Sequence, residues 1–279
     1  VSIKHHACIT IFFNVFGKKY EWDRPNAGAV GRFDMEGLDD VFQRFATDIG
    51  SSKNAEFLKQ LFKDAYFNHK NLADATRYIA NSLFGEYGLV VVDADDADLK
   101  ELFVPYFEKE VTKQSSFRAV SQTITSLEKD YKIQVNPREI NLFYLTDNLR
   151  ERIVYDGKYY TINNTALKFT EDEIVSEIKR NPSAFSPNVI VRPLYQEVIL
   201  PNLCYIGGGG ELAYWMQFKS YFKSNDVPFP ILLLRNSVQV FSGKQARKLN
   251  KLGISKPHIF PKQADLIAEK VRENSDLTI

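Results

Sequence analysis

The chain has 279 residues, of which 44% are hydrophobic and 25% charged, the proportions of an ordinary globular protein. Its 36 Lys and Arg residues nearly balance its 35 Asp and Glu residues, which gives a formal charge of +1. Proteins that bind nucleic acid without sequence preference normally carry a basic excess, so the charge argues against that class of partner.

The cysteines and the apolar runs indicate in which cellular compartment the protein is expected. Cys8 and Cys204 form no C-x-x-C pair, so the sequence suggests neither a disulfide framework nor a zinc site, and we predict no metal. The apolar run FPILLL at residues 229–234 is far too short to span a membrane. The N-terminal VSIKHHACITIFF has no signal-peptide pattern. We therefore expect a cytoplasmic protein with no membrane partner.

Residues 1–134 are predicted to combine a hairpin with helices. Residues 9–22 read as two strands joined by a turn at 17–19, and residues 35–84 show apolar residues at helical spacing in three segments. Serines open the second of these segments. The unbroken β-branched run at residues 88–93 predicts a buried strand of a parallel sheet, followed by helices over 96–110 and 115–130.

The remaining residues fall into three predicted parts. Residues 135–170 are predicted to form a β-rich insertion of short antiparallel strands, with a turn at residues 156–157. In residues 171–261 a capped helix at 171–180 precedes the order strand (188–191), helix (193–200), strand (203–206), helix to about 224, and strand (230–234). Residues 262–279 are predicted to begin a helical, coiled-coil region.

The alternating order of strands and helices is typical of a doubly wound sheet. We therefore predict an α/β fold with a Rossmann-like, mostly parallel sheet flanked by helices and interrupted by the β-rich insertion.

Four consecutive glycines separate the strand predicted at 203–206 from the helix after it: Gly207, Gly208, Gly209 and Gly210. Amides at such a turn point outward and the helix dipole adds positive charge, which favours a phosphate or carboxylate. Glu211 could accept a hydrogen bond from a ligand or cap the first helical turn. A tight packing turn would explain the glycines as well as a ligand site does.

Other polar residues also follow predicted strands. Arg192 and Gln196 come after residues 188–191, and Arg235 and Asn236 come after residues 230–234. An arginine there suits a carboxylate or phosphate, or a structural salt bridge. Asp93, with two further aspartates at 95 and 96, could hold a metal or a substrate amine, but helix capping is the favoured interpretation.

Two residues near the glycines are weighed separately. Tyr214 lies off the apolar face of the helix that follows them. Cys204 lies within an apolar run and is interpreted as a buried, inert thiol.

Several segments resemble one known family. The stretch SPNVIVRPLYQEVILPNLCYIGGGGELAYWMQF and the later FPILLLRNS are similar to the bacillithiol biosynthesis enzymes that add cysteine to glucosaminyl malate in the final step. FFNVFGKKYEW, GAVGRF, LADATRYIANSLFGEYGLVVVDADD and NLFYLTDNLRERI resemble the same family. The resemblance runs from about Phe12 to the C-terminus.

The resemblance implies a Rossmann-like core with insertions, akin to class I aminoacyl-tRNA synthetases, and a C-terminal coiled coil. It implies that the four glycines, Glu211, Arg192, Gln196 and Asn236 line the pocket. The glycines would then hold an anionic part of the substrates, such as ATP or another nucleotide. We add Tyr214, Arg235 and Asp93 as candidate binding residues, and assign no catalytic residue.

The resemblance also has limits. Family members are longer at both ends, and VSIKHHACIT at the N-terminus differs from their acidic, His-containing segment. We predict a ligase that activates the cysteine carboxyl and joins it to the amine of glucosaminyl malate as an amide. The alternative is a non-catalytic ligand-binding or interaction fragment. An exposed apolar sheet edge would favour a homodimer.

Overall fold

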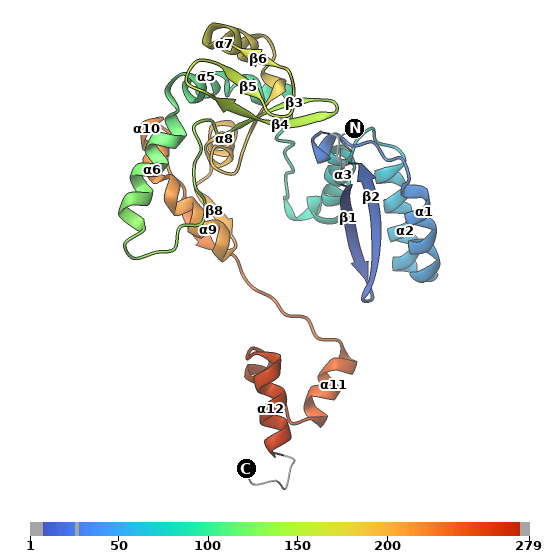
Figure 1. Cartoon of the computed structure of the whole chain (residues 1–279). Helices are drawn as coiled ribbons and strands as arrows, with labels where there is room; N and C mark the ends of the chain where they lie inside the picture. The colour runs from blue at the N-terminus through green and yellow to red at the C-terminus, as the bar shows by residue number, and fades with distance from the viewer. Residues whose placement is uncertain (1–7, 26–27, 274–279) are drawn as a thin grey trace, which may run out of the picture. The chain divides into compact units, whose positions relative to one another are not determined.

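The computed structural model describes residues 8–25 and 28–273 (Figure 1). The chain divides into two compact units, Val1–Leu234 and Arg235–Ile279, which we describe separately. Across the described residues, no helix is long and apolar enough to cross a membrane. The predicted domain boundaries after residues 134, 170 and 261 stay predictions, and the atypical N-terminal segment lies mostly outside the described residues.

The first unit begins with a hairpin and a set of helices. These elements are, in chain order, β1 (Cys8–Val15), β2 (Lys18–Pro25), the 3-10 turn η1 (Val30–Arg32), α1 (Leu38–Asp48), α2 (Lys53–Tyr66), α3 (Leu72–Phe84) and the 3-10 turn η2 (Gly85–Tyr87). The predicted hairpin is confirmed: β1 and β2 are antiparallel, and Phe16 and Gly17 at the turn both have positive φ.

The three predicted helices are also confirmed. The Ser52 hydroxyl caps α2 by accepting from the amide of Ala55, and the Asn71 side chain caps α3 in the same way. Their apolar faces pack with β2 into an aromatic-rich N-terminal cluster of Tyr20, Trp22, Phe33, Leu38, Val41, Phe42, Phe45 and Phe62.

The prediction of a buried strand over residues 88–93 is wrong. Gly88 has a φ of 84°, and the residues after it are extended but pair with no other described strand. Val90 is 80% exposed. A β-branched run favours extended backbone, but only a neighbouring strand can turn that preference into a sheet.

The middle of the unit contains helices and a five-stranded sheet. Its elements are α4 (Ala97–Glu101), α5 (Val104–Lys113), α6 (Ser115–Leu127), β3 (Leu142–Thr146), β4 (Leu149–Tyr155), β5 (Tyr160–Ile162), β6 (Lys168–Phe169), α7 (Glu171–Arg180), η3 (Pro182–Ala184), β7 (Phe185–Pro187) and α8 (Arg192–Ile199). The helix predicted at 96–110 is therefore two helices. Asp96 caps α4 by accepting from two backbone amides, as the capping interpretation expects.

The sheet runs β6-β5-β4-β3-β7 and all its pairs are antiparallel. The predicted β-rich residues thus form most of the largest sheet rather than an insertion into a parallel one. The strand predicted at 188–191 is wrong, because the Asn188 side-chain oxygen accepts from the amides of Ile190 and Val191 and bends the chain into α8.

The parallel part of the fold is small. It consists of β8 (Cys204–Gly207) and β9 (Ile231–Leu234), joined by α9 (Gly209–Trp215), the 3-10 turn η4 (Met216–Phe218) and α10 (Lys219–Ser224). The two strands pair in parallel, with Gly207 opposite Leu234, which confirms the predicted pattern for this segment. The described fold is mixed α/β, with a mostly antiparallel set of strands.

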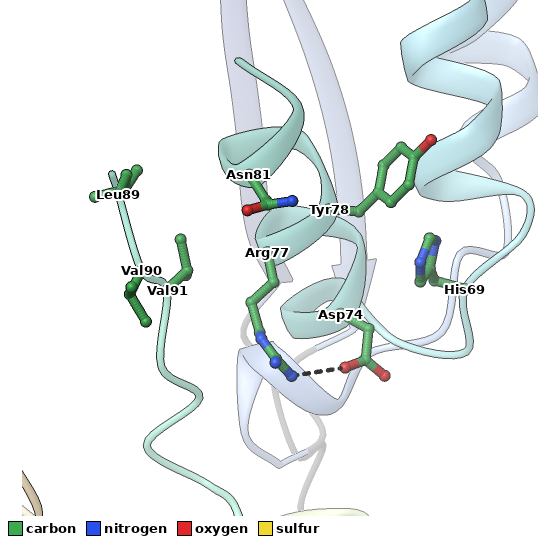
Figure 2. Close-up of a pocket in the computed structure, with 8 residues that line it drawn as sticks. All are labelled: His69, Asp74, Arg77, Tyr78, Asn81, Leu89, Val90 and Val91. Carbon is green, nitrogen blue, oxygen red and sulfur yellow. Dashed lines mark ion pairs between the residues drawn. The ribbon is translucent and has the colours of Figure 1, made fainter. Parts of the chain in front are cut away.

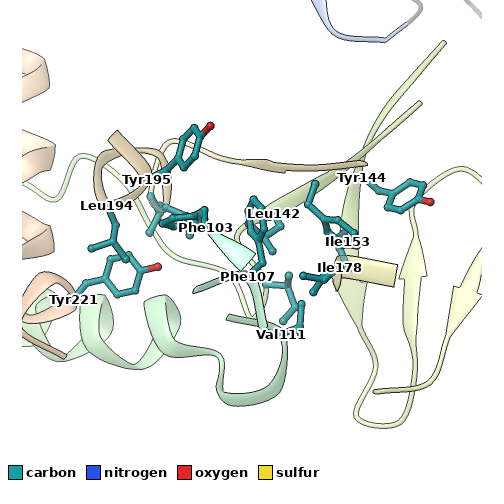
Figure 3. Packing of buried hydrophobic residues seen from close by; sticks show 14 of the residues in the cluster. Phe103, Phe107, Val111, Leu142, Tyr144, Ile153, Ile178, Leu194, Tyr195 and Tyr221 are labelled. Atoms are coloured by element: carbon teal, nitrogen blue, oxygen red, sulfur yellow. The ribbon is translucent and has the colours of Figure 1, made fainter. Parts of the chain in front are cut away.

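A large central core holds the middle of the unit together (Figure 3). Phe103, the residue before α5, and Phe107 of α5 pack in one buried cluster with Leu142 of β3 and Tyr195 of α8. Tyr221 of α10 is fully buried in the same cluster. Aromatic residues therefore join the sheet to the helices on both sides of the glycine turn in sequence.

A partly buried charge network joins η1 to the middle of the unit. Asp95 accepts from the guanidinium of Arg32 at 2.5 and 3.1 Å and pairs with Lys100, which is only 1% exposed. Both cations also donate to the backbone carbonyl of Ser183, at 3.2 and 3.1 Å. One carboxylate thus ties η1, α4 and η3 together.

The second unit contains α11 (Gly243–Lys251), the 3-10 turn η5 (Lys256–Ile259) and α12 (Gln263–Glu273). Ser242 and Gln245 form a capping box at the start of α11. A helix does follow residue 262, but the predicted coiled coil stays a prediction.

We expect Asp95→Asn to lower the free energy of unfolding by about 2–3 kcal/mol, because it leaves the buried Lys100 without its carboxylate. The partial exposure of Asp95 keeps this below the loss expected for a fully buried pair. Urea unfolding followed by circular dichroism measures the change. The exposed Asp130→Asn is the matched control, and equal losses in both variants would contradict the role of the network.

The same comparison should depend on pH. Burial raises the pKa of Asp95, but the hydrogen bonds from Arg32 and Lys100 outweigh it and hold that pKa below its ordinary value of 3.8. Such a group contributes stability above its unfolded-state pKa and loses it as the pH falls through the folded-state value. The difference between wild type and Asp95→Asn should stay constant down to about pH 5 and shrink below about pH 4. A difference that grows on acidification would refute the assignment.

Candidate anion-binding site

The glycines of the turn differ in their surroundings, because Gly207 is closely packed whereas Gly209 and Gly210 border open space. Gly207 ends β8, and a Cβ added to it would lie 2.7 Å from the Tyr205 ring and 3.2 Å from Leu212, so this position is needed for close packing. A Cβ at Gly209 or Gly210, by contrast, would meet no atom within 4 Å. None of the four glycines has a positive φ. The backbone of Gly209 and Gly210 is therefore accessible at the start of α9, where the first amides of a helix have no partner within the helix.

Glu211 caps the turn. Its carboxylate accepts from the amide of Gly208 at 2.7 Å and from the hydroxyl of Tyr205 at 3.3 Å. The structure thus shows the capping role that the sequence left open for Glu211, and its contact with a ligand stays a prediction. Tyr205, which the sequence analysis did not select, stacks on the fully buried Trp215 with ring centroids 4.0 Å apart.

Three of the predicted residues meet beside this turn. Arg192, the first residue of α8, donates to the side-chain oxygen of Gln196 at 3.2 Å and to the hydroxyl of Tyr214 at 3.1 Å. Gln196 in turn donates to the buried Glu197 at 3.0 Å. The guanidinium of Arg192 is thus held in one orientation by neutral acceptors, which leaves its positive charge available to an anion.

The other predicted residues are not part of this cluster. Asp93 accepts from the amide of Asp95 at 2.9 Å, which forms a local turn before α4. Arg235 and Asn236 belong to the second compact unit, so their predicted place beside the glycines stays a prediction. Cys204 is a free, half-buried thiol. No group of three or more His, Cys, Asp or Glu side chains in the described part of the chain could hold a metal ion.

Arg192 also lines a cavity that the sequence analysis missed. The cavity, which we call the arginine pocket, has a volume of about 580 Å³ and lies between the loop before β3, the β3–β4 hairpin and the loop before α8. Its polar lining consists of Arg138, Arg150, Arg152, Arg192, Asn136 and Asn188. No carboxylate is among the lining residues.

The arginine pocket has an excess of positive charge. None of its four arginines forms an ion pair with a carboxylate of residues 8–25 or 28–273. The guanidinium of Arg150 lies 3.8 Å from the centre of the Phe143 ring, and burial lowers the pKa of Arg150. Planar guanidinium groups bind carboxylates and phosphates through paired hydrogen bonds, so the chemistry of the pocket suits a ligand with more than one negative charge.

A buried polar network positions the pocket wall. The fully buried carboxylate of Glu110 accepts from the amide of Asn141 at 3.0 Å and from both the amide and hydroxyl of Ser116 at 2.9 and 2.6 Å. Asn141 in turn accepts from the amide of Arg138 at 3.1 Å and the side chain of Asn188 at 2.9 Å. The backbone that carries two pocket residues is therefore fixed from inside the core.

The arginines had a weak signal in the sequence. Arg150 and Arg152 alternate in a predicted strand, so they face the same side of the sheet. Their partners, Arg138 and Arg192, lie in separate segments, and only the folded chain brings the four together.

Comparison with known proteins shows the family of the chain. A family model described as "Bacillithiol biosynthesis BshC, N-terminal Rossmann-like domain" matches residues 7–236. A relative from Flavobacterium johnsoniae is 54% identical over 256 residues, which cover 92% of this chain and 48% of the relative. A relative from Christiangramia forsetii is 53% identical over 274 residues, covering 96% and 51%. One from Staphylococcus aureus is 29% identical over 185 residues, covering 65% and 34%.

All three relatives carry the name "Putative cysteine ligase BshC". The chain spans about half the length of the first two. The family model covers most of the chain, and the match includes both the glycine turn and the arginine pocket. The chain therefore belongs to the BshC family of bacillithiol biosynthesis.

Proposed function

We propose that the chain forms the part of a cysteine ligase that binds glucosaminyl malate, with the malate carboxylates in the arginine pocket. The observation that carries the proposal is the presence of four arginines and no carboxylate around one cavity. Malate brings two carboxylates, and each can pair with a guanidinium through two parallel hydrogen bonds. The name of the relatives supports a ligase, and the pocket suits this substrate.

We propose further that the glycine turn holds the phosphates of ATP or another nucleotide. Gly209 and Gly210 offer open space beside the first amides of α9, and Arg192 lies close to the turn through its hydrogen bond to Tyr214. These residues fit an anionic group. A bound nucleotide would supply the activation that the cysteine carboxyl needs before an amine can displace its oxygen.

The bond-forming step is the attack of the sugar amine on the activated cysteine carboxyl. The amine nitrogen bonds to the carboxyl carbon, the bond from that carbon to its leaving oxygen breaks, and the nitrogen loses a proton to give an amide. Negative charge grows on oxygen during this step. Arg192 belongs to both the pocket and the cluster beside the turn, so in this proposal its oriented guanidinium stabilises that charge.

Arg150→Gln and Arg152→Gln should each weaken the binding of L-malate by about tenfold or more, because each removes a charged partner of a carboxylate. Isothermal titration calorimetry measures the affinity, and L-lactate, which has one carboxylate, should show a smaller loss. Arg118→Gln on the exposed face of α6 is the control. Equal malate affinity in all three variants would exclude the arginine pocket as the malate site. Malate binding without amide formation would favour the alternative of a non-catalytic binding fragment.

Alanine substitutions should separate the packing role of Gly207 from the proposed phosphate-binding role of Gly209 and Gly210. Gly209→Ala and Gly210→Ala place a methyl in open space and should leave the fold intact, since alanine favours a helix by up to about 1 kcal/mol. The same methyl fills the space of a phosphate, so both variants should bind ATP several-fold more weakly. Gly207→Ala should instead lower the unfolding free energy by about 1–3 kcal/mol, because its methyl meets the Tyr205 ring. Unchanged ATP affinity in Gly209→Ala and Gly210→Ala would exclude the glycine turn as the phosphate site.

A further inference from the structure

Charged side chains that belong neither to the arginine pocket nor to the glycine turn gather on α3 and on α11. On α3, Arg77 is balanced by Asp74 at 3.6 Å. Figure 2 shows residues 89–91 on the opposite side of that helix from His69 and Tyr78, so these groups form no common binding surface. On α11, by contrast, every charged side chain is positive.

One face of α11 carries four cations. They are spaced by three or four residues, so they lie within about 100° of the helix circumference and along about 10 Å of its length. All four side chains are exposed, and we call them the basic stripe: Lys244, Arg247, Lys248 and Lys251. None of them forms an ion pair with a carboxylate of residues 8–25 or 28–273.

The basic stripe is unfavourable for the helix that carries it. Lys244 lies next to Lys248, and Arg247 next to Lys251, at the spacing where like charges repel each other. The helix dipole favours the two lysines of the last turn but not Lys244 in the first. Residues 227–264 contain no Asp or Glu that could compensate. An anionic partner would remove this repulsion.

The overall charge of the chain does not reveal this surface. Residues 235–279 hold nine Lys and Arg against four Asp and Glu, which leaves 27 against 31 in residues 1–234. The second compact unit is thus basic and the first acidic, although the whole chain carries a charge of +1. The prediction of no membrane partner concerns spanning segments, and a helix that lies on a membrane surface needs none.

Exposed apolar side chains flank the basic stripe at both ends. Val238 and Val240 precede α11 and are 81% and 79% exposed, and Leu252 directly after the helix is 61% exposed. Leu252 lies four residues after Lys248 and so borders the stripe. Nucleic acid would neutralise the cations but offers little apolar surface to these side chains. A membrane surface suits both, because lipid phosphates pair with the cations and the acyl boundary takes the apolar side chains.

We propose that the basic stripe, with its flanking apolar residues, binds the surface of an anionic phospholipid membrane. The cations attract the chain to the surface, and the apolar side chains hold it there, because neither signal alone gives stable binding. This binding does not depend on the proposed ligase activity, so either proposal can fail without the other.

Flotation of the full chain with lipid vesicles tests the proposal. We expect binding to vesicles of phosphatidylglycerol and phosphatidylcholine in equal parts, and binding about tenfold weaker or less to phosphatidylcholine alone. Binding should also weaken as the salt concentration rises, because salt screens exposed charges. Absence of binding to the anionic vesicles, or equal binding to both kinds, would overturn the proposal.

Charge variants assign the binding to α11. Lys244→Gln combined with Lys248→Gln should weaken binding to the anionic vesicles about twentyfold, since each cation near the surface contributes about fivefold. Lys244→Arg combined with Lys248→Arg keeps both charges and should bind like the wild type. Lys129→Gln with Lys132→Gln removes two exposed lysines of the first unit and is the matched control. The same loss in the control as in the first variant would refute the role of the stripe.

Two further measurements separate a membrane from other anionic partners. Leu252→Ser should weaken vesicle binding several-fold without changing its dependence on salt, because it removes apolar contact and no charge. A mixed-sequence RNA duplex is the competing probe. If the chain binds the duplex more tightly than the anionic vesicles, and loses that binding in Lys244→Gln with Lys248→Gln, the stripe is a nucleic-acid surface and the membrane proposal is wrong.

Discussion

The carboxylate of Glu110 is the constraint on which the centre of the fold depends. It is removed from water, and such a group is stable inside a protein only when several donors satisfy it. The donors come from the start of α6 and from the residue just before β3, so α5, α6 and the sheet must approach one another in one arrangement. Aromatic packing supplies most of the attraction between these elements, but it does not specify an orientation in this way.

Two asparagines connect Glu110 to the arginine pocket. The amide of Asn141 donates to Glu110, the side-chain oxygen of Asn141 accepts from the side chain of Asn188, and Asn188 bends the chain into α8. Arg192 follows immediately, as the first residue of that helix. The orientation of the proposed anion site is therefore determined by a buried acidic group that never meets the ligand. A polar network of this kind gives a rigid site, because any member that moves leaves a partner unsatisfied.

The near-zero net charge of the chain conceals how unevenly charge is distributed. Positive and negative side chains are almost equal in number, yet four arginines surround one cavity without a carboxylate in its lining. The total charge argues against a general nucleic-acid binder, which stays a prediction, and it says nothing about a local anion site. Local fields depend on where charges are placed, and only the fold determines that.

The sequence predicted the elements with strong local signals. Capped helices such as Glu171–Arg180, the N-terminal hairpin and the strand–glycine–helix turn are all present, because each depends on neighbours within a few residues. Residues 88–93 and 188–191 were mispredicted for opposite reasons. The first has strand propensity but no partner strand, and in the second the side chain of Asn188 captures the backbone amides that a strand would need.

The candidate site likewise contains residues that a local motif predicted and residues that only the folded chain brings together. Glu211 and Tyr214 follow the predicted glycine motif within about one helical turn, whereas Arg192 and Gln196 lie on the helix before β8. The structure brings Arg192, Gln196 and Tyr214 together. Arg138, Arg150 and Arg152 come from distant segments, and their convergence depends on the pairing of β3 with β4 and β7. No spacing rule along the chain reports that pairing.

The glycine turn follows β8 of the short parallel pair β8–β9, so the stability of this pair affects the turn. Parallel strands are usually covered on both faces, but Ile206, Ile231, Leu233 and Leu234 are largely exposed here. A two-stranded sheet with so little burial opens at low free energy, and the turn at its end shares that local instability. We therefore expect a ligand held by the turn to stabilise the paired strands as it binds. By the same linkage, a partner that covers β8–β9 should tighten ligand binding without touching the ligand.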